Sequence, residues 1–195
     1  MKSKGFTLIE LAVVLAIIAV LAAVLTPMVT GYLDQARTAR AQGDVRTIAD
    51  SIRLYQRDTG RWPIFYNSAA YTGNSASSVE IATNGSTFPT AGSGWLVTSG
   101  VSLGSTSLEV YMNSDLTGVG NAAFPKAGFR GPYIKTVDTD PWGHTYVLNA
   151  NDLAGTTNHA YIISAGPNGT LETTRDVPVG TTLTAGGDDI ISVIK

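Results

Sequence analysis

A single carboxylate near the N-terminus is the residue whose position says most about the chemistry of this chain. Glu10 stands at the start of an almost unbroken apolar run from Leu11 to Leu25. Burying an ionised carboxylate in a membrane-spanning segment costs roughly 2.5–3.5 kcal/mol on insertion scales. We therefore expect Glu10 to have a partner that offsets its charge.

A second pattern has the spacing of a catalytic motif. Residues Gly100–Gly104 match the Gly-x-Ser-x-Gly nucleophile elbow of hydrolases, with Ser102 at the centre. The acid and base of a triad would follow in α/β-hydrolase order: Asp115 or Asp138, then His144 or His159. An elbow needs a helix after it, whereas residues 105–111 read as a strand. We therefore interpret the segment as a Gly/Ser turn and both histidines as turn or surface residues, and we predict no enzymatic activity.

The apolar run is long enough to cross a membrane. A helix over residues 6–29 would span about 36 Å, which exceeds the hydrocarbon thickness of a bilayer. The lysines before Gly5 would hold the N-terminus in the cytoplasm. Two alternatives are a secretory signal peptide cleaved near Ala19–Ala23 and a plain membrane anchor. The plain anchor leaves Glu10 unexplained.

The helix is expected to continue beyond the membrane, from Phe6 to about Asp58. Pro27 should kink it or melt it locally. After the proline, apolar residues recur at helical steps of three and four: Ala41, Val45, Ile48, Ile52 and Tyr55. The charged residues between 37 and 57 fall largely off this face, which indicates a solvated face or contacts with neighbouring subunits. Thr59-Gly60 and Pro63 should end the helix.

The remainder of the chain changes in character twice. Residues 64–128 are rich in Gly, Ser, Thr and Asn, and we read them as an ordered loop region, with a flexible linker as the alternative. Its best candidate strands are Trp95–Val97 and Leu108–Met112. Residues 129–195 contain β-rich runs at Thr145–Leu148 and Ala160–Ser164 and an apolar end at Ile190–Ile194. We predict an α+β fold, in which the long helix packs on a small antiparallel sheet.

Composition limits the possible partners. The net charge is −2 and charged residues make up only 14% of the chain, so we expect no nucleic-acid partner. There is no cysteine. A domain outside the cytoplasm must therefore be stabilised by its core, by assembly or by a metal rather than by disulfides.

The N-terminal pattern resembles the class III signal of type IV pilins and type II secretion pseudopilins. The residues that carry the resemblance are Lys4-Gly5 followed by Phe6-Thr7-Leu8-Ile9-Glu10. It implies that a prepilin peptidase removes residues 1–5 as a leader by cutting after Gly5, and methylates Phe6. It also implies that Glu10 pairs with the Phe6 amine of a neighbouring subunit during assembly.

Three further motifs resemble those of major pseudopilins in particular. They are the helix exit at 55–63, the entry to the sheet at 131–134 and 140–146, and a calcium loop at 164–169 with 187–190. This resemblance implies calcium as the cofactor. The implied ligands are the Ala165 and Ile190 carbonyls and the Asn168 and Asp188 side chains, with Asp189 as a spare.

The calcium loop departs from the family pattern in two ways. Asn168 stands where the family usually has aspartate, so one negative charge is missing. The loop from Gly169 to Gly187 is longer than usual, and its Asp176 could compete for the metal.

The resemblance implies a structural function. The subunit would wait in the inner membrane with its C-terminal domain outside the cytoplasm, then polymerise into a periplasmic or extracellular filament. The helix of residues 6–29, with Glu10 and Pro27, and the amphipathic half 30–63 would mediate assembly. Implied partners are other copies of the chain, the prepilin peptidase, an inner-membrane assembly platform, minor pilins or pseudopilins, and lipid. A surface pilus subunit for adhesion or motility is the alternative, and a membrane-anchored periplasmic hydrolase is a remote one.

Overall fold

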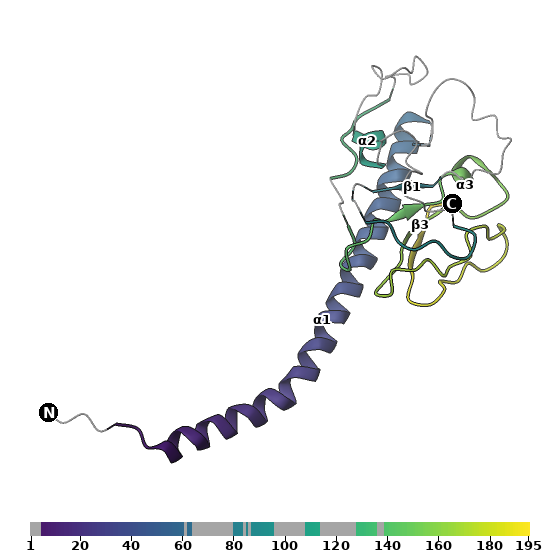
Figure 1. The fold of residues 1–195 in the computed structure, drawn as a ribbon. Coiled ribbons are helices and arrows are strands. Elements are labelled where there is room, and N and C mark those ends of the chain that lie inside the picture. The colour runs from purple at the N-terminus through teal and green to yellow at the C-terminus, as the bar shows by residue number, and fades with distance from the viewer. Residues whose placement is uncertain are drawn as a thin grey trace. The chain divides into compact units, whose positions relative to one another are not determined.

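The computed structural model describes residues 5–60, 62–63, 80–83, 85, 87–95, 108–113, 128–135 and 139–195. The statements below refer to these residues. The chain divides into two compact units, Met1–Arg37 and Thr38–Lys195. Its elements follow the order α1, β1, α2, β2, α3, β3, β4 (Figure 1).

Helix α1 covers Leu8–Thr59 and ends where the sequence predicts. Gly60 follows it with φ +71°, and its N–H donates to the Gln56 carbonyl, as a left-handed C-terminal cap requires. The predicted melting at Pro27 is wrong, because the helix continues through the proline. Hydroxyl groups beside it make extra contacts: Thr26 donates to the Ala22 carbonyl and Thr30 to the Pro27 carbonyl.

The sheet has four antiparallel strands in the order β1-β2-β3-β4. They are β1 Ile81–Ala82, β2 Val147–Leu148, β3 Tyr161–Ser164 and β4 Ile190–Val193. Three of them fall in the runs that the sequence predicts, whereas β1 was not expected. All four residues of β3 are buried, because this central strand has core on both sides.

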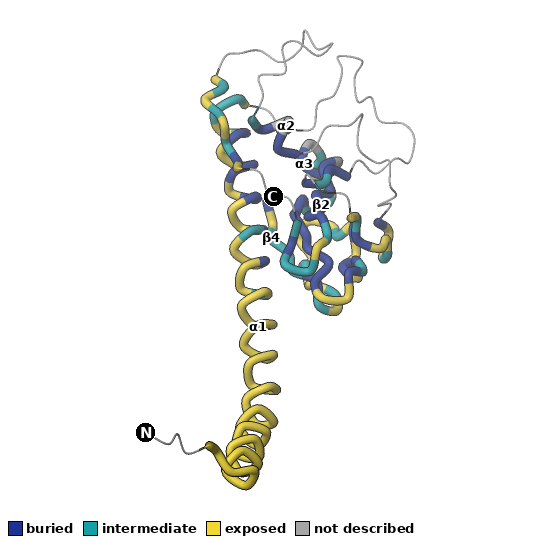
Figure 2. The backbone as a smooth tube through the Cα atoms, turned by 60° about the vertical axis from the view of Figure 1, so that its left-hand side comes forward, coloured by how far each residue is buried: buried dark blue, intermediate teal, exposed yellow. Residues whose placement is uncertain are grey.

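The core lies on both faces of the sheet. Alternate side chains of a strand point to opposite faces, and Ile162 packs with the buried face of α1, including Ile48 and Ile52. Tyr161 and Ile163 instead pack with Trp95, Leu171 and their neighbours on the other face. In Figure 2 the buried positions of α1 lie in its C-terminal part, which belongs to the unit Thr38–Lys195. The predicted α+β fold is confirmed.

The strand predicted at Leu108–Met112 is wrong. These residues belong to helix α2, Leu108–Asn113. Leu108 and Met112 are both fully buried, and a spacing of four residues places them on one face of a helix. Of the other candidate strand, Trp95 is not in a strand, and residues 96–97 lie outside the described residues. The short helix α3, Asn151–Ala154, occupies the polar stretch between β2 and β3.

Candidate assembly and metal sites

The N-terminal end of α1 is closed by Thr7 and Glu10. The Thr7 N–H and hydroxyl both donate to Glu10 Oε2, at 2.8 and 2.7 Å, and the Glu10 N–H donates to the Thr7 hydroxyl oxygen at 3.3 Å. This reciprocal pair is a capping box, in which Thr7 precedes the first helical residue. Thr7 is a site residue that the sequence-based prediction lacks, although Thr-x-x-Glu before an apolar run is itself the signal.

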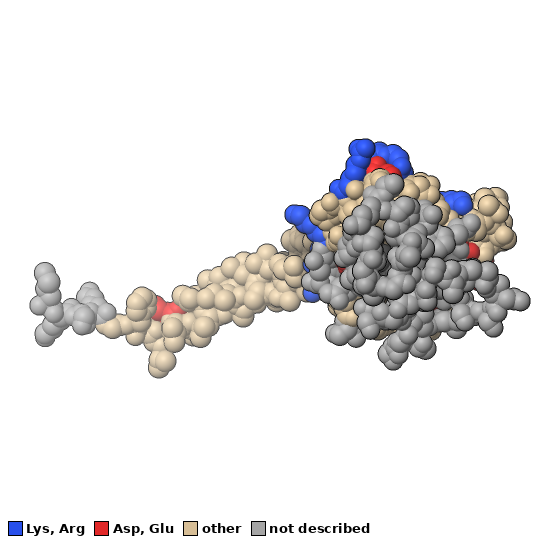
Figure 3. All heavy atoms as spheres, turned by 90° about the horizontal axis from the view of Figure 1, so that it is seen from above, with Lys and Arg blue, Asp and Glu red and all other residues tan. Residues whose placement is uncertain are grey.

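The first unit presents an exposed apolar helix surface. Phe6 and Leu8 are 89% and 88% exposed, and the large apolar side chains from there to Leu33 are at least half exposed. In Figure 3 the surface of this part of α1 is almost entirely uncharged. By length and composition, α1 could cross a membrane. A continuous apolar surface of this kind is suited to lipid or to other protein.

Charged pairs line the part of α1 that belongs to the second unit. Arg40 Nε lies 3.5 Å from Asp44 Oδ2, at the i,i+4 spacing typical of helices. Asp44 also accepts a 2.8 Å hydrogen bond from the Tyr146 hydroxyl, which attaches the helix to the sheet. Arg53 pairs with Asp50 at 2.6 Å.

The two turns of the predicted calcium loop meet in the structure. The Asn168 N–H donates to Asp188 Oδ2 at 2.9 Å. Gly166 has φ +62°, and a Cβ there would overlap the Asp188 carbonyl, so the turn after Ala165 lies directly against Asp188. Asp188 Oδ1 is buried and has no hydrogen-bond partner within the described part of the chain. Ile190 follows as the first residue of β4.

Asp189 points inward and serves the fold. It is 6% exposed, and its Oδ2 accepts hydrogen bonds from the Glu172 N–H, the Thr173 N–H and the Thr173 hydroxyl, at 2.6–2.8 Å. Burial raises the pKa of the Asp189 carboxyl, and these hydrogen bonds oppose the rise. The predicted competitor, Asp176, pairs with Arg175.

Glu172 is a further acid at this site, and the sequence-based prediction omits it. Its Oε2 accepts a 3.0 Å hydrogen bond from Asn168 Nδ2. A Cβ on Gly187 would overlap the same oxygen, so the carboxylate lies against the second turn. The signal in the sequence was an acid four residues after Asn168.

The donor set fits calcium rather than a softer metal. Asn168, Glu172 and Asp188 offer oxygen ligands, which calcium prefers. Among the described residues, no three His, Cys, Asp or Glu side chains are grouped so that they could hold a metal ion. A calcium site here would therefore need amide and backbone oxygens as well, including the carbonyls of Ala165 and Ile190.

The residues of the hydrolase interpretation do not form a described site. Ser102, Asp115 and Asp138 lie outside the described residues. His144 belongs to a turn in which its N–H donates to Asp140 Oδ1 at 2.9 Å. His159 Nε2 lies 3.2 Å from the Thr181 carbonyl oxygen.

The fold and the capped apolar helix define a pilin-like subunit. Residues 1–26 match the family model of the prokaryotic N-terminal methylation motif, and residues 114–179 match that of type II secretion system protein G. At these two segments, and over most of its length in the relatives below, the chain resembles type IV pilins and type II secretion pseudopilins.

Individual relatives show the same similarity. The type II secretion system core protein G of Escherichia coli (strain K12) is 28% identical over 177 residues, which cover 90% of each chain. That of Klebsiella pneumoniae is 23% identical over 176 residues, which cover 90% of this chain and 93% of the relative. The type IV major alpha-pilin of Moraxella bovis is 48% identical over 42 residues, covering 22% and 26% of the two chains. No solved structure matches.

Proposed function

We propose that this chain is the subunit of a type IV-type filament, namely the pseudopilus of a type II secretion system. The observation that carries the proposal is the exposed apolar helix whose first turn holds an acid at Glu10. The relatives that cover 90% of the chain and bear the name core protein G support the choice of a secretion pseudopilus. Before assembly the subunit is anchored in the inner membrane, with residues 38–195 outside the cytoplasm.

In this proposal a prepilin peptidase cuts after Gly5 and methylates Phe6. The freed Phe6 amine then carries a positive charge in an apolar setting. Glu10 Oε2 is already occupied by both Thr7 donors, so the second carboxylate oxygen remains for the amine of a neighbouring subunit. Ion pairs in a low dielectric are stable only when their hydrogen bonds are complete, which would favour one axial register between subunits.

Glu10→Ala is expected to insert in the membrane but to lose most of its filament yield. Insertion is retained because an expensive charge has been removed. After cell lysis, assembled filaments are separated from membrane-held subunit and the two amounts are compared. The intact mass of the filament subunit is then measured, and it should correspond to a chain that begins at Phe6. Asp34→Ala is the matched control, since Asp34 is an exposed acid of the same helix. Filament yield equal to that of wild type, at equal expression, would rule out the role of Glu10.

A surface pilus is the second candidate function. The short similarity to a major alpha-pilin and the length of residues 64–128 favour it. Electron microscopy under native expression separates the two functions. A pseudopilus should remain within the envelope, and its loss should abolish export of secreted proteins, whereas a pilus should extend from the cell.

We further propose that calcium binds between the turns at 165–169 and 187–190. Buried Asp188 Oδ1, which lacks a partner in the described structure, supports this site. When bound, the ion would cross-link the two turns through oxygen ligands: the Asn168 and Asp188 side chains and the Ala165 and Ile190 carbonyls.

Calcium should raise the melting temperature of the full chain in detergent relative to chelator. A ligand that binds only the folded state stabilises it by about 2.7 kcal/mol at a hundredfold excess over its Kd. Asp188→Ala should abolish the shift, and Asn168→Asp should enlarge it by adding a charge. If calcium still raises the melting temperature of Asp188→Ala, the metal binds elsewhere.

A further inference from the structure

We propose that Glu172 is a calcium ligand that supplies the negative charge missing at Asn168. This inference rests on the proposed calcium site and is independent of the filament function. It assigns to this chain an acid from the lengthened loop, in place of an aspartate at the position of Asn168.

The Glu172 carboxylate lies next to residues of both turns. Glu172 Oε2 lies 3.0 Å from Asn168 Nδ2. On its other side is the backbone of Gly187, which has φ +48° and no room for a side chain beside this oxygen. The carboxylate therefore lies between the two turns that carry Asn168 and Asp188.

The backbone of Glu172 is fixed without help from its side chain. Its N–H donates to Asp189 Oδ2 at 2.8 Å, and its carbonyl accepts a 2.8 Å hydrogen bond from the Ser93 hydroxyl. The residues on either side are held as well: the Leu171 N–H donates to the Thr90 carbonyl, and Trp95 Nε1 donates to the Thr173 carbonyl. Hydrogen bonds from segment 90–95 therefore hold residues 171–173 and fix the position of the Glu172 backbone, as a ligand site requires.

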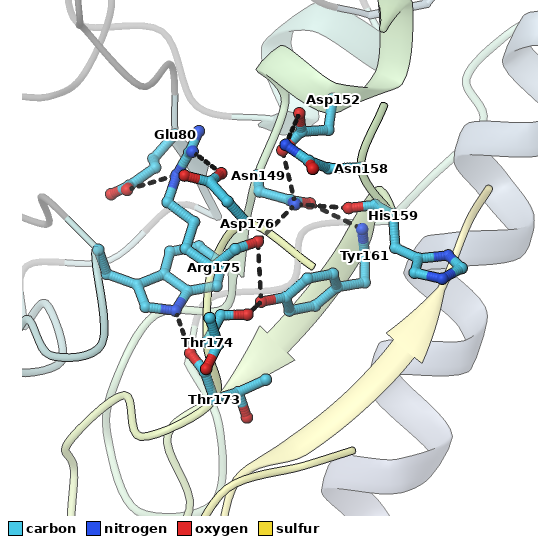
Figure 4. Close-up of polar contacts among 11 residues, drawn as sticks. Glu80, Asn149, Asp152, Asn158, His159, Tyr161, Thr173, Thr174, Arg175 and Asp176 are labelled. Atoms are coloured by element: carbon cyan, nitrogen blue, oxygen red, sulfur yellow. Dashed lines mark hydrogen bonds and ion pairs between the residues drawn. The ribbon is translucent and has the colours of Figure 1, made fainter. Parts of the chain in front are cut away.

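The negative charge at this site is not offset by a salt bridge, because neither Glu172 nor Asp188 takes part in one within the described part of the chain. Arg175, the arginine of the same loop, forms ion pairs with Glu80 and Asp176 instead, and its Nε lies 3.3 Å from Glu80 Oε1 (Figure 4). Two carboxylates beside an amide, with one buried oxygen unpartnered, form a site in which a divalent cation offsets the charge.

Calcium affinity of the full chain in detergent tests the proposal, measured by competition with a chromophoric chelator. Glu172→Gln keeps the size of the side chain and its ability to accept from Asn168, but removes its charge. We expect its Kd to rise about tenfold or more, because ligand charge sets calcium affinity. Its melting temperature in chelator should stay close to that of wild type. The double variant Glu172→Gln, Asn168→Asp should recover most of the affinity.

Asp176→Asn is the matched control, because it removes a charge from the same loop at a side chain that is 55% exposed and paired with Arg175. Its Kd should change far less than that of Glu172→Gln. Equal Kd values for wild type and Glu172→Gln, with binding still abolished by Asp188→Ala, would overturn the role of Glu172 while leaving the calcium site in place. Absence of calcium binding by wild type at millimolar concentration would overturn both.

Discussion

At the scale of single residues, Thr7 supplies hydrogen bonds to Glu10, the acid at the start of the apolar helix. Its N–H and hydroxyl both donate to Glu10, so the carboxylate has hydrogen-bond donors within its own chain. Under the proposed function, these donors would reduce the cost of placing the acid near lipid before a neighbouring subunit's amine pairs with it. Thr7 and Glu10 therefore act as one unit, with the threonine positioning the carboxylate.

Replacing Thr7 with valine should fray the first turn of α1. The substitution removes the hydroxyl of the capping box at nearly constant shape, and loss of an N-cap costs about 0.5–2 kcal/mol. Amide hydrogen exchange at residues 8–11, measured on the full chain in micelles, should become faster. Thr26→Val is the control, because Thr26 donates to a carbonyl inside the helix rather than at its end. Unchanged exchange in Thr7→Val would show that the cap does not hold this turn.

At the scale of elements, the helix is attached to the sheet by apolar packing and by a few polar contacts. The Tyr146 hydroxyl donates to Asp44 on α1, and Arg53 of α1 donates to the carbonyls of Val193 and Ile194 at the end of β4. The latter contact also covers part of the sheet edge, where unpaired carbonyls would otherwise remain. These contacts set where along α1 the sheet docks.

Tyr146→Phe should lower the free energy of unfolding by about 1.5–3 kcal/mol, the typical contribution of a hydrogen bond to a charged group. Burial and the nearby Asp44 raise the pKa of Tyr146, so its hydroxyl remains protonated in alkaline solution. The loss of stability should therefore be the same at neutral and at mildly alkaline pH. Chemical denaturation at both pH values measures it. If the difference in free energy of unfolding between wild type and Tyr146→Phe disappears at alkaline pH, the Tyr146 hydroxyl does not act as a neutral donor.

At the scale of the whole molecule, polar contacts join segments that are distant in the sequence. Arg175 and Glu80, each 3% exposed, form an ion pair between the C-terminal loop and the segment that leads into β1. Asn149 Nδ2 donates to Asp152 Oδ2 and to the His159 carbonyl, and Asn149 Oδ1 accepts from the Tyr161 N–H (Figure 4). Loop and sheet in the second unit are therefore stabilised together.

This network should make stability depend on pH through Asp152. Burial raises the pKa of Asp152 above its ordinary value of 3.8, although Arg175 and a hydrogen bond from Asn158 oppose the rise. The folded state then holds the proton more tightly than the unfolded state. Asp152 contributes stability below pH 3.8 that is lost as pH rises through the raised pKa of the folded state.

Asp152→Asn should therefore reduce the loss of melting temperature between acid and neutral pH. Part of the loss should remain, because the pKa of Asp189 is raised as well. Melting curves of the full chain across this pH range provide the measurement. A variant that loses as much melting temperature as wild type would show that Asp152 does not titrate in this way.

Local patterns in the sequence determined the long helix, its end at Gly60 and most of the strand positions. Periodicity and a glycine stop depend on residues close together in the chain, so they can be read without a structure. The same holds for the N-terminal motif, whose residues are consecutive.

Only the tertiary structure decided the remaining features. Leu108–Met112 suits strand or helix by composition, and burial of Leu108 with Met112 selected the helix. Strand β1 exists because Ile81 and Ala82 pair with β2, more than sixty residues later. Glu172 came to lie beside Asn168, and Asp189 turned inward, because two distant turns were brought together. Contacts over such separations leave no periodic signal, since loop closure and packing of the whole chain determine them.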